Sequence, residues 1–265
     1  MGAVDLLIKE IITVYGSTLL LTVVIVYIVH WQWAKFVKNI YRLHLMGFEA
    51  ECAELAVNYK KRLFAPLNGA ISNDKILQSE GAIRLLEIGV KTGENIQFYP
   101  DGTHLICVDW NRKLEDYLMK SDRAWQFSHV KFKKLIPSDG RSLKVIPSNC
   151  VDAVVTVRSL CACSSVRETL REIRRVLAPG GKYFFLEHVP DKEETFTRWL
   201  QDFLTKTKIY PSLFGDCRLD SNPLCNIKST GFSKVSWESI VLKGYVTHPY
   251  HFYLSRNHIM GIATK

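Results

Sequence analysis

The feature that most constrains this chain is an uncharged segment close to its start. No charged side chain occurs within Ile11–Ala34, and the 19 residues of Ile11–Val29 are almost wholly apolar. In an α-helix such a segment spans about 28 Å, close to the roughly 30 Å hydrocarbon thickness of a bilayer. We therefore expect residues 1–34 to form a membrane anchor.

The flanks of this segment argue against a cleaved signal peptide, which has a basic start, a shorter apolar stretch and a small-residue cleavage site. This chain begins with two acids and one lysine, and it places Trp31 and Trp33 where cleavage would occur. Tryptophans at that position are typical of interfacial anchors. Two alternatives stay open, a buried core helix and a shallow hairpin on one leaflet that bends at residues 16–18.

Basic residues are concentrated on the carboxyl side of the apolar segment. Lys35, Lys38 and Arg42 follow it, whereas Lys9 alone precedes it. This asymmetry predicts that the rest of the chain lies in the cytosol. The seven cysteines have no Cys-x-x-Cys frame, which fits neither a disulfide scaffold nor a tetrahedral zinc site, so we expect a reducing compartment and no metal.

The pattern changes after the anchor. Residues 35–65 have the spacing of a helix, and proline and glycine residues then mark a linker up to residue 81. Residues 82–265 alternate short apolar segments with helical stretches, which predicts a doubly wound α/β sheet. The expected strands are 83–88, 105–108, 130–136, 151–157 and 182–187, with a helix over 166–177 and an antiparallel edge pair over 235–240 and 258–263.

Ligands of such sheets bind at the carboxyl ends of the strands, and three motifs fall there. The turn Glu87–Gly93 contains glycines that let the backbone approach a ligand. Asp109 ends the second strand, where a carboxylate can accept hydrogen bonds from both hydroxyls of a ribose. Asp139-Gly140 follows the third strand, where an acid can accept one from an adenine amino group. Together the motifs predict a cofactor that contains adenosine.

Glu87-x-Gly89-x-Lys91-x-Gly93 resembles the E/D-x-G-x-G-x-G motif of class I S-adenosylmethionine-dependent methyltransferases, and residues 176–181 (VLAPGG) resemble their helix end before the fifth strand. Over residues 11–265, most densely over 84–189, the chain is similar to the methyltransferase-like protein 7 family. Members of that family are membrane-anchored methyltransferases of the endoplasmic reticulum and lipid droplets that act on alkyl thiols.

The resemblance implies a seven-stranded Rossmann-like sheet, S-adenosyl-L-methionine as cofactor and a small lipophilic thiol as substrate. The positions that match the cofactor motifs are Glu87, Gly89, Lys91, Gly93, Asp109, Asp139 and Gly140.

Two positions depart from the family pattern. Lys91 stands where the family has glycine, and a side chain there takes space beside the cofactor and strains the backbone if φ is positive. One interpretation is a lysine that points to solvent and leaves binding intact; the other is weak binding, or a catalytically silent protein. Arg141 replaces an acidic or amide residue near the expected adenine contact.

Methyl transfer to a thiol needs alignment, a dry site and the thiolate form of the acceptor. The candidates for lowering the thiol pKa are His188 beyond the fifth strand and Arg158 beyond the fourth, each with a structural alternative. Cys161 and Cys163 lie near the expected substrate position, and we interpret them as small apolar filler. The apolar segment Phe196–Cys225 is expected to cover the substrate pocket.

The net charge of +9 allows an anionic partner, either nucleic acid or a membrane surface. The basic residues gather beside the anchor and over residues 167–175, without an interleaved aromatic stripe, so a nucleic-acid methyltransferase is not favoured. A nicotinamide oxidoreductase is a remote alternative because it shares this type of sheet.

Overall fold

The computed structural model describes residues 2–112, 114–120, 124–247 and 249–265. The chain divides into two units, Met1–Leu45 and Met46–Lys265. Helix α1 (Ala3–Leu55) supplies the whole of the first unit apart from its start, and it runs without interruption through residues 16–18. The bend that a one-leaflet hairpin requires is therefore not present in this helix.

The apolar part of α1 has the properties of a membrane span. By length and composition Lys9–Gln32 is long enough to cross a bilayer, and its apolar window has 0% of its residues buried. The core-helix alternative therefore does not hold. The hydroxyl groups of Thr13, Thr18 and Thr22 donate hydrogen bonds to carbonyls four residues earlier, so they too are satisfied within the helix.

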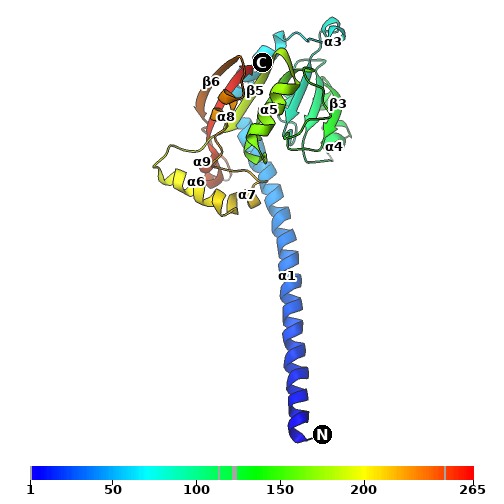
Figure 1. The fold of residues 1–265 in the computed structure, drawn as a ribbon, viewed down its shortest axis with the longest axis vertical. Coiled ribbons are helices and arrows are strands. Elements are labelled where there is room, and N and C mark those ends of the chain that lie inside the picture. The colour runs from blue at the N-terminus through cyan, green and yellow to red at the C-terminus, as the bar shows by residue number, and fades with distance from the viewer. Residues whose placement is uncertain (1, 113, 121–123, 248) are drawn as a thin grey trace. The chain divides into compact units, whose positions relative to one another are not determined.

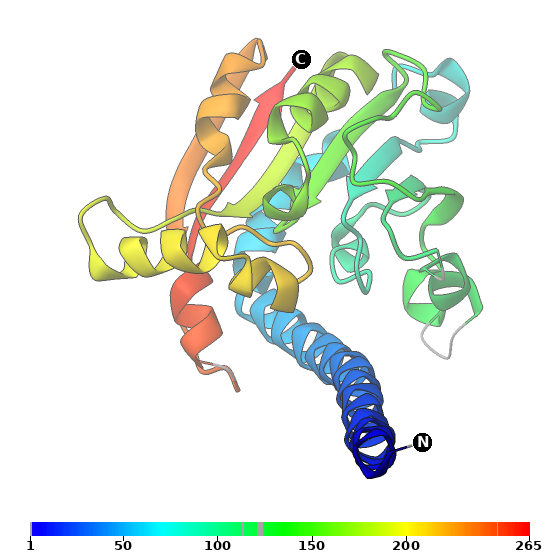
Figure 2. The same cartoon turned by 60° about the horizontal axis from the view of Figure 1, so that its bottom comes forward.

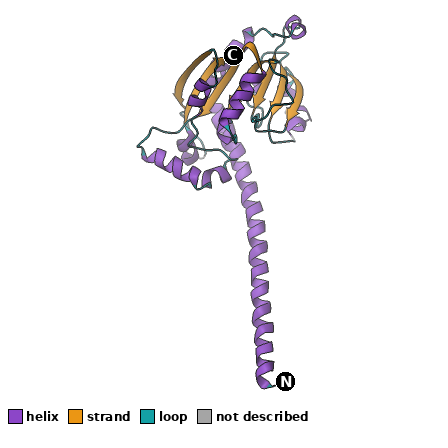
Figure 3. Ribbon diagram, in the orientation of Figure 1, coloured by secondary structure: helices purple, strands orange, loops and turns teal. Residues whose placement is uncertain are grey.

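The second unit is an α/β domain in which helices cover both faces of a sheet (Figures 1 and 3). The strands are β1 (Arg84–Ile88), β2 (His104–Val108), β3 (Lys131–Ile136), β4 (Val151–Val157), β5 (Leu177–His188), β6 (Lys234–Val241) and β7 (Asn257–Thr264). The other helices are α2 (Val57–Phe64), α3 (Lys75–Ser79), α4 (Leu114–Lys120), α5 (Val166–Val176), α6 (Phe196–Lys206), α7 (Ile209–Leu213), α8 (Pro223–Ser229) and α9 (Pro249–Ser255). Short 3-10 helices are η1 (Ala65–Gly69), η2 (Ile96–Phe98), η3 (Ala124–Phe127) and η4 (Leu160–Ala162).

The strand order confirms the predicted fold class. Among the described residues the sheet has seven strands in the order β3-β2-β1-β4-β5-β7-β6. Strands β1 to β5 are parallel, and β7 is antiparallel to both β5 and β6. Strand β4 is buried at all of its positions, as expected for a central strand with helices on both faces.

The predicted antiparallel edge pair is confirmed: β6 and β7 pair at one edge of the sheet, with β6 outermost and β7 next to β5. Two other features differ from those predicted. Strand β5 begins at Leu177 and not at Lys182, because the Pro-Gly-Gly segment continues beside β4 through a register shift. A Cβ on Gly181 would lie 2.9 Å from the Ala178 carbonyl oxygen, so only glycine allows this close passage. Helix α1 runs on to Leu55, so the anchor and the first part of the helix expected over 35–65 form one continuous helix.

An apolar layer packs against each face of the sheet. Leu170 and Ile173 of α5 and Ile227 of α8 pack in the layer on one face. Phe48 of α1 and Phe64 of α2 pack in the layer on the other. Figure 2 shows α5 and α8 in front of the sheet and the α1–α2 segment behind it. Helices α6, α7 and α9 lie at the carboxyl ends of the strands, where the predicted ligand site is.

Candidate active site

The turn after β1 has a backbone conformation that strongly restricts its side chains. Gly89 and Gly93 have φ of 76° and 79°, in the left-handed region that favours glycine. A Cβ on Gly89 would lie 2.5 Å from the Cβ of Ser159, at the end of β4. Lys91 has the same kind of backbone, with φ of 55°, so the strain that its side chain was expected to cause is present.

The acids after β2 and β3 accept hydrogen bonds from backbone amides and, at Asp139, also from a side-chain hydroxyl. Asp109 accepts hydrogen bonds from the amide of Lys91 at 3.0 Å and from that of Asn111 at 2.8 Å, so it ties the glycine turn to the end of β2. Asp139 accepts one from the amide of Arg141 and another from the hydroxyl of Ser164. Partial burial opposes ionisation of Asp139, but these hydrogen bonds lower its pKa overall.

The last cofactor candidate, Gly140, has φ of 84°, and a Cβ there would lie 3.0 Å from the Ile88 side chain. Glycine at this position therefore lets the chain pass close to the end of β1. The neighbouring Arg141 points away, to an exposed ion pair with Glu168 at 3.8 Å.

Glu87 lies inside the domain and not at the surface of a cavity. Its side chain is 0% exposed and accepts hydrogen bonds from Asn95 Nδ2 and Tyr99 Oη, both at 2.7 Å. Burial raises the pKa of Glu87 to about 7, although both hydrogen bonds act in the opposite direction. Through these two hydrogen bonds, Glu87 fixes the position of the segment that follows the glycine turn.

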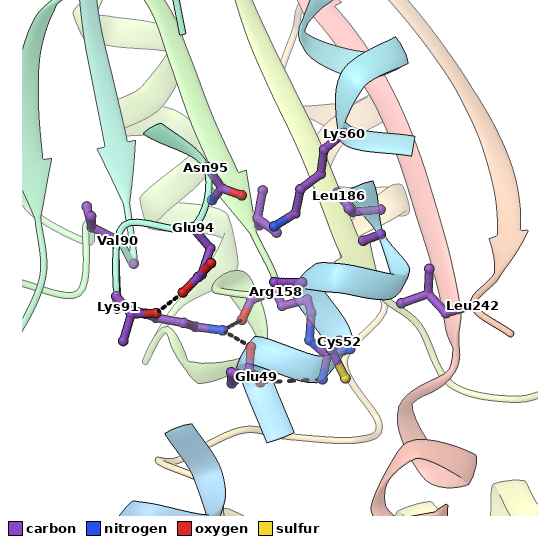
Figure 4. A pocket seen from close by; sticks show the side chains of 15 residues that line it. Glu49, Cys52, Lys60, Val90, Lys91, Glu94, Asn95, Arg158, Leu186 and Leu242 are labelled. Carbon is purple, nitrogen blue, oxygen red and sulfur yellow. Dashed lines mark hydrogen bonds and ion pairs between the residues drawn. The ribbon is translucent and has the colours of Figure 1, made fainter. Parts of the chain in front are cut away.

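A small cavity of about 30 Å³ lies beside this turn (Figure 4), and three charged side chains meet in it. Lys91 Nζ is 2.5 Å from Glu49 Oε2 and donates a hydrogen bond to the Arg158 carbonyl oxygen at 3.2 Å. Arg158 Nη2 is 3.5 Å from Glu49 Oε1. Burial disfavours the charged form of Glu49, but the two cations lower its pKa to about 2. The interpretation of Lys91 as a solvent-pointing residue is therefore wrong.

A second, more open cavity of about 660 Å³ lies at the ends of β2, β3 and β4. Trp110, Asp139 and Ser164 line it, and Trp110 is 69% exposed. The segment that was expected to cover the pocket contributes Lys206 and Asp216 to its wall. The aromatic groups of that segment divide: Tyr210 and Phe214 are buried, whereas those of α6 face outward.

Arg158 is held in place by several groups. It is buried, has φ of 50°, and its Nη1 lies 2.8 Å from His258 Nε2 on β7. Its guanidinium also lies over the Phe48 ring, 5.6 Å from the centroid. With the Glu49 ion pair, these contacts join α1, β4 and β7 at one point.

His188 ends β5 and is 1% exposed. Its Nε2 lies 3.2 Å from Cys217 Sγ, and Cys217 Sγ lies 3.1 Å from Cys161 Sγ. Cys161 is therefore not simple apolar filler, because its thiol faces two polar groups. Cys163 instead donates to the Asp139 carbonyl oxygen at 3.1 Å.

Sequence reasoning missed three residues of this region. Glu49 lies in the segment assigned to the juxtamembrane helix, where a single charge has no distinctive pattern. Trp110 directly follows Asp109, and its position after the second strand could have been used to predict that it lines the ligand site, because ligands bind at the carboxyl ends of the strands. Cys217 lies in the loop after α7 and has no local signal at all.

The strand order, the glycine turn after β1 and the acids after β2 and β3 define a class I S-adenosylmethionine-dependent methyltransferase. Residues 86–185 match the family model for a methyltransferase domain. A solved structure of geranyl diphosphate methyltransferase in complex with S-adenosylmethionine has the same fold, with a TM-score of 0.54 and 13% identity over 78% of this chain and 84% of that one.

Curated relatives define the family. Human thiol S-methyltransferase TMT1B is 30% identical over 208 residues, which are 78% of each chain. Human thiol S-methyltransferase TMT1A is 29% identical over 233 residues, 88% of this chain and 89% of the relative. The chain belongs to this thiol S-methyltransferase family, which confirms the resemblance found in the sequence.

Proposed function

We propose that this protein is a membrane-anchored thiol S-methyltransferase that binds S-adenosyl-L-methionine and methylates small lipophilic thiols. The observation that carries the proposal is the pair of cavities at the carboxyl edge of the sheet. The larger cavity has an exposed aromatic face and an acid, and the smaller cavity has a compact group of opposite charges. These are the features that the two ends of the cofactor require.

The larger cavity suits the adenosyl end. Trp110 offers a flat apolar face on which an adenine can stack. Asp139 lines the same cavity and is held ready to accept a hydrogen bond, while Asp109 at the turn suits the ribose hydroxyls. Gly89 and Gly93 shape the backbone between these acids and the smaller cavity.

The smaller cavity suits the amino-acid end. Glu49, Lys91 and Arg158 together carry one negative and two positive charges, which is complementary to an ammonium and a carboxylate on one ligand. In our proposal the ammonium takes the place of a cation on Glu49, and the carboxylate pairs with Lys91 or Arg158. This needs the Lys91–Glu49 pair to open.

When bound, S-adenosylmethionine supplies an electrophilic methyl group on a sulfonium. The chain supplies alignment, exclusion of water and a place for the acceptor near the ends of β4 and β5. Arg158 positions Glu49, and His188 is the candidate group that faces the acceptor side.

The anchor supports an acceptor that partitions into membranes. We assign residues 1–34 to this anchor, residues 35–81 to a juxtamembrane helix and linker, and residues 82–265 to the catalytic domain. We place the protein in the endoplasmic reticulum membrane and on lipid droplets, with the catalytic domain in the cytosol. The family resemblance and the basic residues after the anchor support this placement.

The test is calorimetry of the full-length protein with S-adenosylmethionine, followed by a methylation assay with an alkyl thiol. We expect binding and product, and about tenfold weaker binding for Trp110→Ala, because stacking on an aromatic side chain is worth about 1–3 kcal/mol. Trp125→Ala is the matched control, since Trp125 is equally exposed on η3 and lines neither cavity. No affinity in the wild-type protein would contradict the proposal.

One observation favours a second function, a catalytically silent protein that keeps the fold: the Lys91 side chain occupies part of the smaller cavity. Comparing Lys91→Gly with Lys91→Met separates the two. If the side chain blocks the cofactor, only Lys91→Gly creates strong binding, because Lys91→Met keeps the bulk. If the charge assists binding, Lys91→Met weakens it and wild type binds.

A further inference from the structure

Three elements bring two thiols and an imidazole together at the carboxyl edge of the sheet. Cys161 lies in η4, His188 ends β5, and Cys217 lies in the loop between α7 and α8. Their ligand atoms all lie within 4.8 Å of one another. The cluster is the one group of three or more such side chains with this geometry among the residues that the structure describes.

We propose that Cys161, His188 and Cys217 bind a zinc ion. Thiolate sulfur and imidazole nitrogen are the ligands that Zn²⁺ prefers, at about 2.3 and 2.0–2.1 Å. Tetrahedral zinc would hold these atoms about 3.6–3.8 Å apart. The sulfur–sulfur and nitrogen–sulfur distances are 3.1 and 3.2 Å, so small side-chain rotations are enough. The buried His188 Nδ1 has no hydrogen-bond partner among the described residues, so a small rotation of the imidazole breaks no hydrogen bond at that atom.

The charge balance of the cluster supports a metal. On binding, each thiol releases its proton to water and forms a sulfur–zinc bond, with no change in oxidation state. Two thiolates, one neutral imidazole and a divalent ion sum to zero charge, which a buried site tolerates.

Three protein ligands are typical of zinc sites that keep a position open for a substrate. Ala162 and Asp216, which are next in sequence to Cys161 and Cys217, line the larger cavity, and the Arg158 guanidinium interacts electrostatically with Cys217. We infer that the open position takes the sulfur of the acceptor thiol, which loses its proton to water as the sulfur–zinc bond forms. Arg158 would offset the added negative charge. This part rests on the proposed thiol acceptor.

The first experiment measures metal content in full-length protein purified in detergent without chelator. We expect one zinc per chain in wild type and at least a tenfold loss in Cys217→Ser. Cys225→Ser is the control, because Cys225 is an exposed cysteine on α8 outside the cluster, and it should keep its zinc. Equal zinc in Cys217→Ser and wild type would overturn the site.

The second experiment replaces zinc with Co²⁺ and records the visible absorption of the wild-type protein. Tetrahedral cobalt bands with thiolate charge transfer are expected, and an added alkyl thiol should strengthen the charge transfer in the absence of S-adenosylmethionine. No cobalt spectrum, or a Cys161–Cys217 disulfide found by mass spectrometry in place of the metal, would refute the site. This readout holds even if a variant does not fold.

Failure of this proposal and failure of the proposed function are separable. Cofactor binding is measured by calorimetry without added metal or thiol, whereas the cobalt spectrum needs no cofactor. If the protein binds S-adenosylmethionine but neither zinc nor cobalt, the proposed function is supported and the metal site is refuted. If the cobalt spectrum does not respond to thiol, the metal site is supported but the open position for the acceptor thiol is refuted.

Discussion

At the scale of single residues, two nearby positions of the glycine turn after β1 differ in the side chains that they can accept. Gly89 has no space for a Cβ because Ser159 packs against it. Lys91, two residues later, has a positive φ but a side chain that fits, because Glu49 receives its ammonium group. Backbone conformation alone therefore does not decide which residues the turn accepts.

Replacing Gly89 with alanine should lower stability by about 1–3 kcal/mol, since it adds both strain and a steric clash. We expect a lower thermal unfolding midpoint and weaker cofactor binding. Gly69→Ala is the matched control, because nothing lies within 4 Å of its Cβ position. An unchanged midpoint for Gly89→Ala would show that the turn does not have this conformation.

Glu87 should make stability depend on pH. Its pKa is raised from 4.5 to about 7 in the folded protein, so between these values the folded state holds a proton that the unfolded chain releases. The resulting stabilisation is complete below pH 4.5 and is lost as the pH rises through about 7.

Glu87→Gln keeps a neutral side chain at every pH and removes this contribution. As the pH rises from about 5 to about 7.5, the free energy of unfolding of the variant should therefore increase relative to wild type by an amount on the order of 1–3 kcal/mol. The thermal unfolding midpoint of the variant should rise relative to wild type in the same direction. Glu115→Gln, an exposed acid on α4, should show no such trend. A pH-independent difference would mean that Glu87 is ionised throughout.

At the scale of elements, α6 differs most from the expectation. The segment was predicted to turn its apolar groups onto the substrate pocket. Instead Phe196, Trp199 and Phe203 are 74, 58 and 45% exposed and stack on one another at 5.5 and 5.6 Å. If the protein is anchored as we propose, this exposed aromatic stripe suits the bilayer interface, because such rings are stable at the level of the headgroups.

We expect this aromatic stripe to contact lipid. In nanodiscs with brominated lipids, Trp199→Ala should remove a quenched part of the tryptophan fluorescence. Trp125→Ala should remove an unquenched part, because Trp125 is exposed on η3, away from α6. Equal quenching in wild type and Trp199→Ala would show that α6 stays in water.

At the scale of the whole molecule, the asymmetry of basic residues around the apolar segment predicts a cytosolic catalytic domain. In sealed microsomes, added protease should digest residues 46–265 without detergent. A luminal control protein must stay intact under the same conditions. Protection of this region until detergent is added would reverse the predicted orientation.

The apolar N-terminal helix, the strand–helix alternation and the acids and glycines at the strand ends could all be predicted from the sequence. These features are local, because helix and strand periodicity and turn composition are encoded in neighbouring residues. Within one motif, however, the roles differ: Asp109 holds the turn, whereas Glu87 is buried behind it.

The direction of the Lys91 side chain, the contribution of Glu49 to a cavity and the order of the two edge strands became known from the folded chain. The Cys161–His188–Cys217 cluster is the clearest case, because its cysteines are 56 residues apart and their spacing argued against a metal. Contacts between distant segments depend on how the sheet and its loops pack, and no short-range pattern records them.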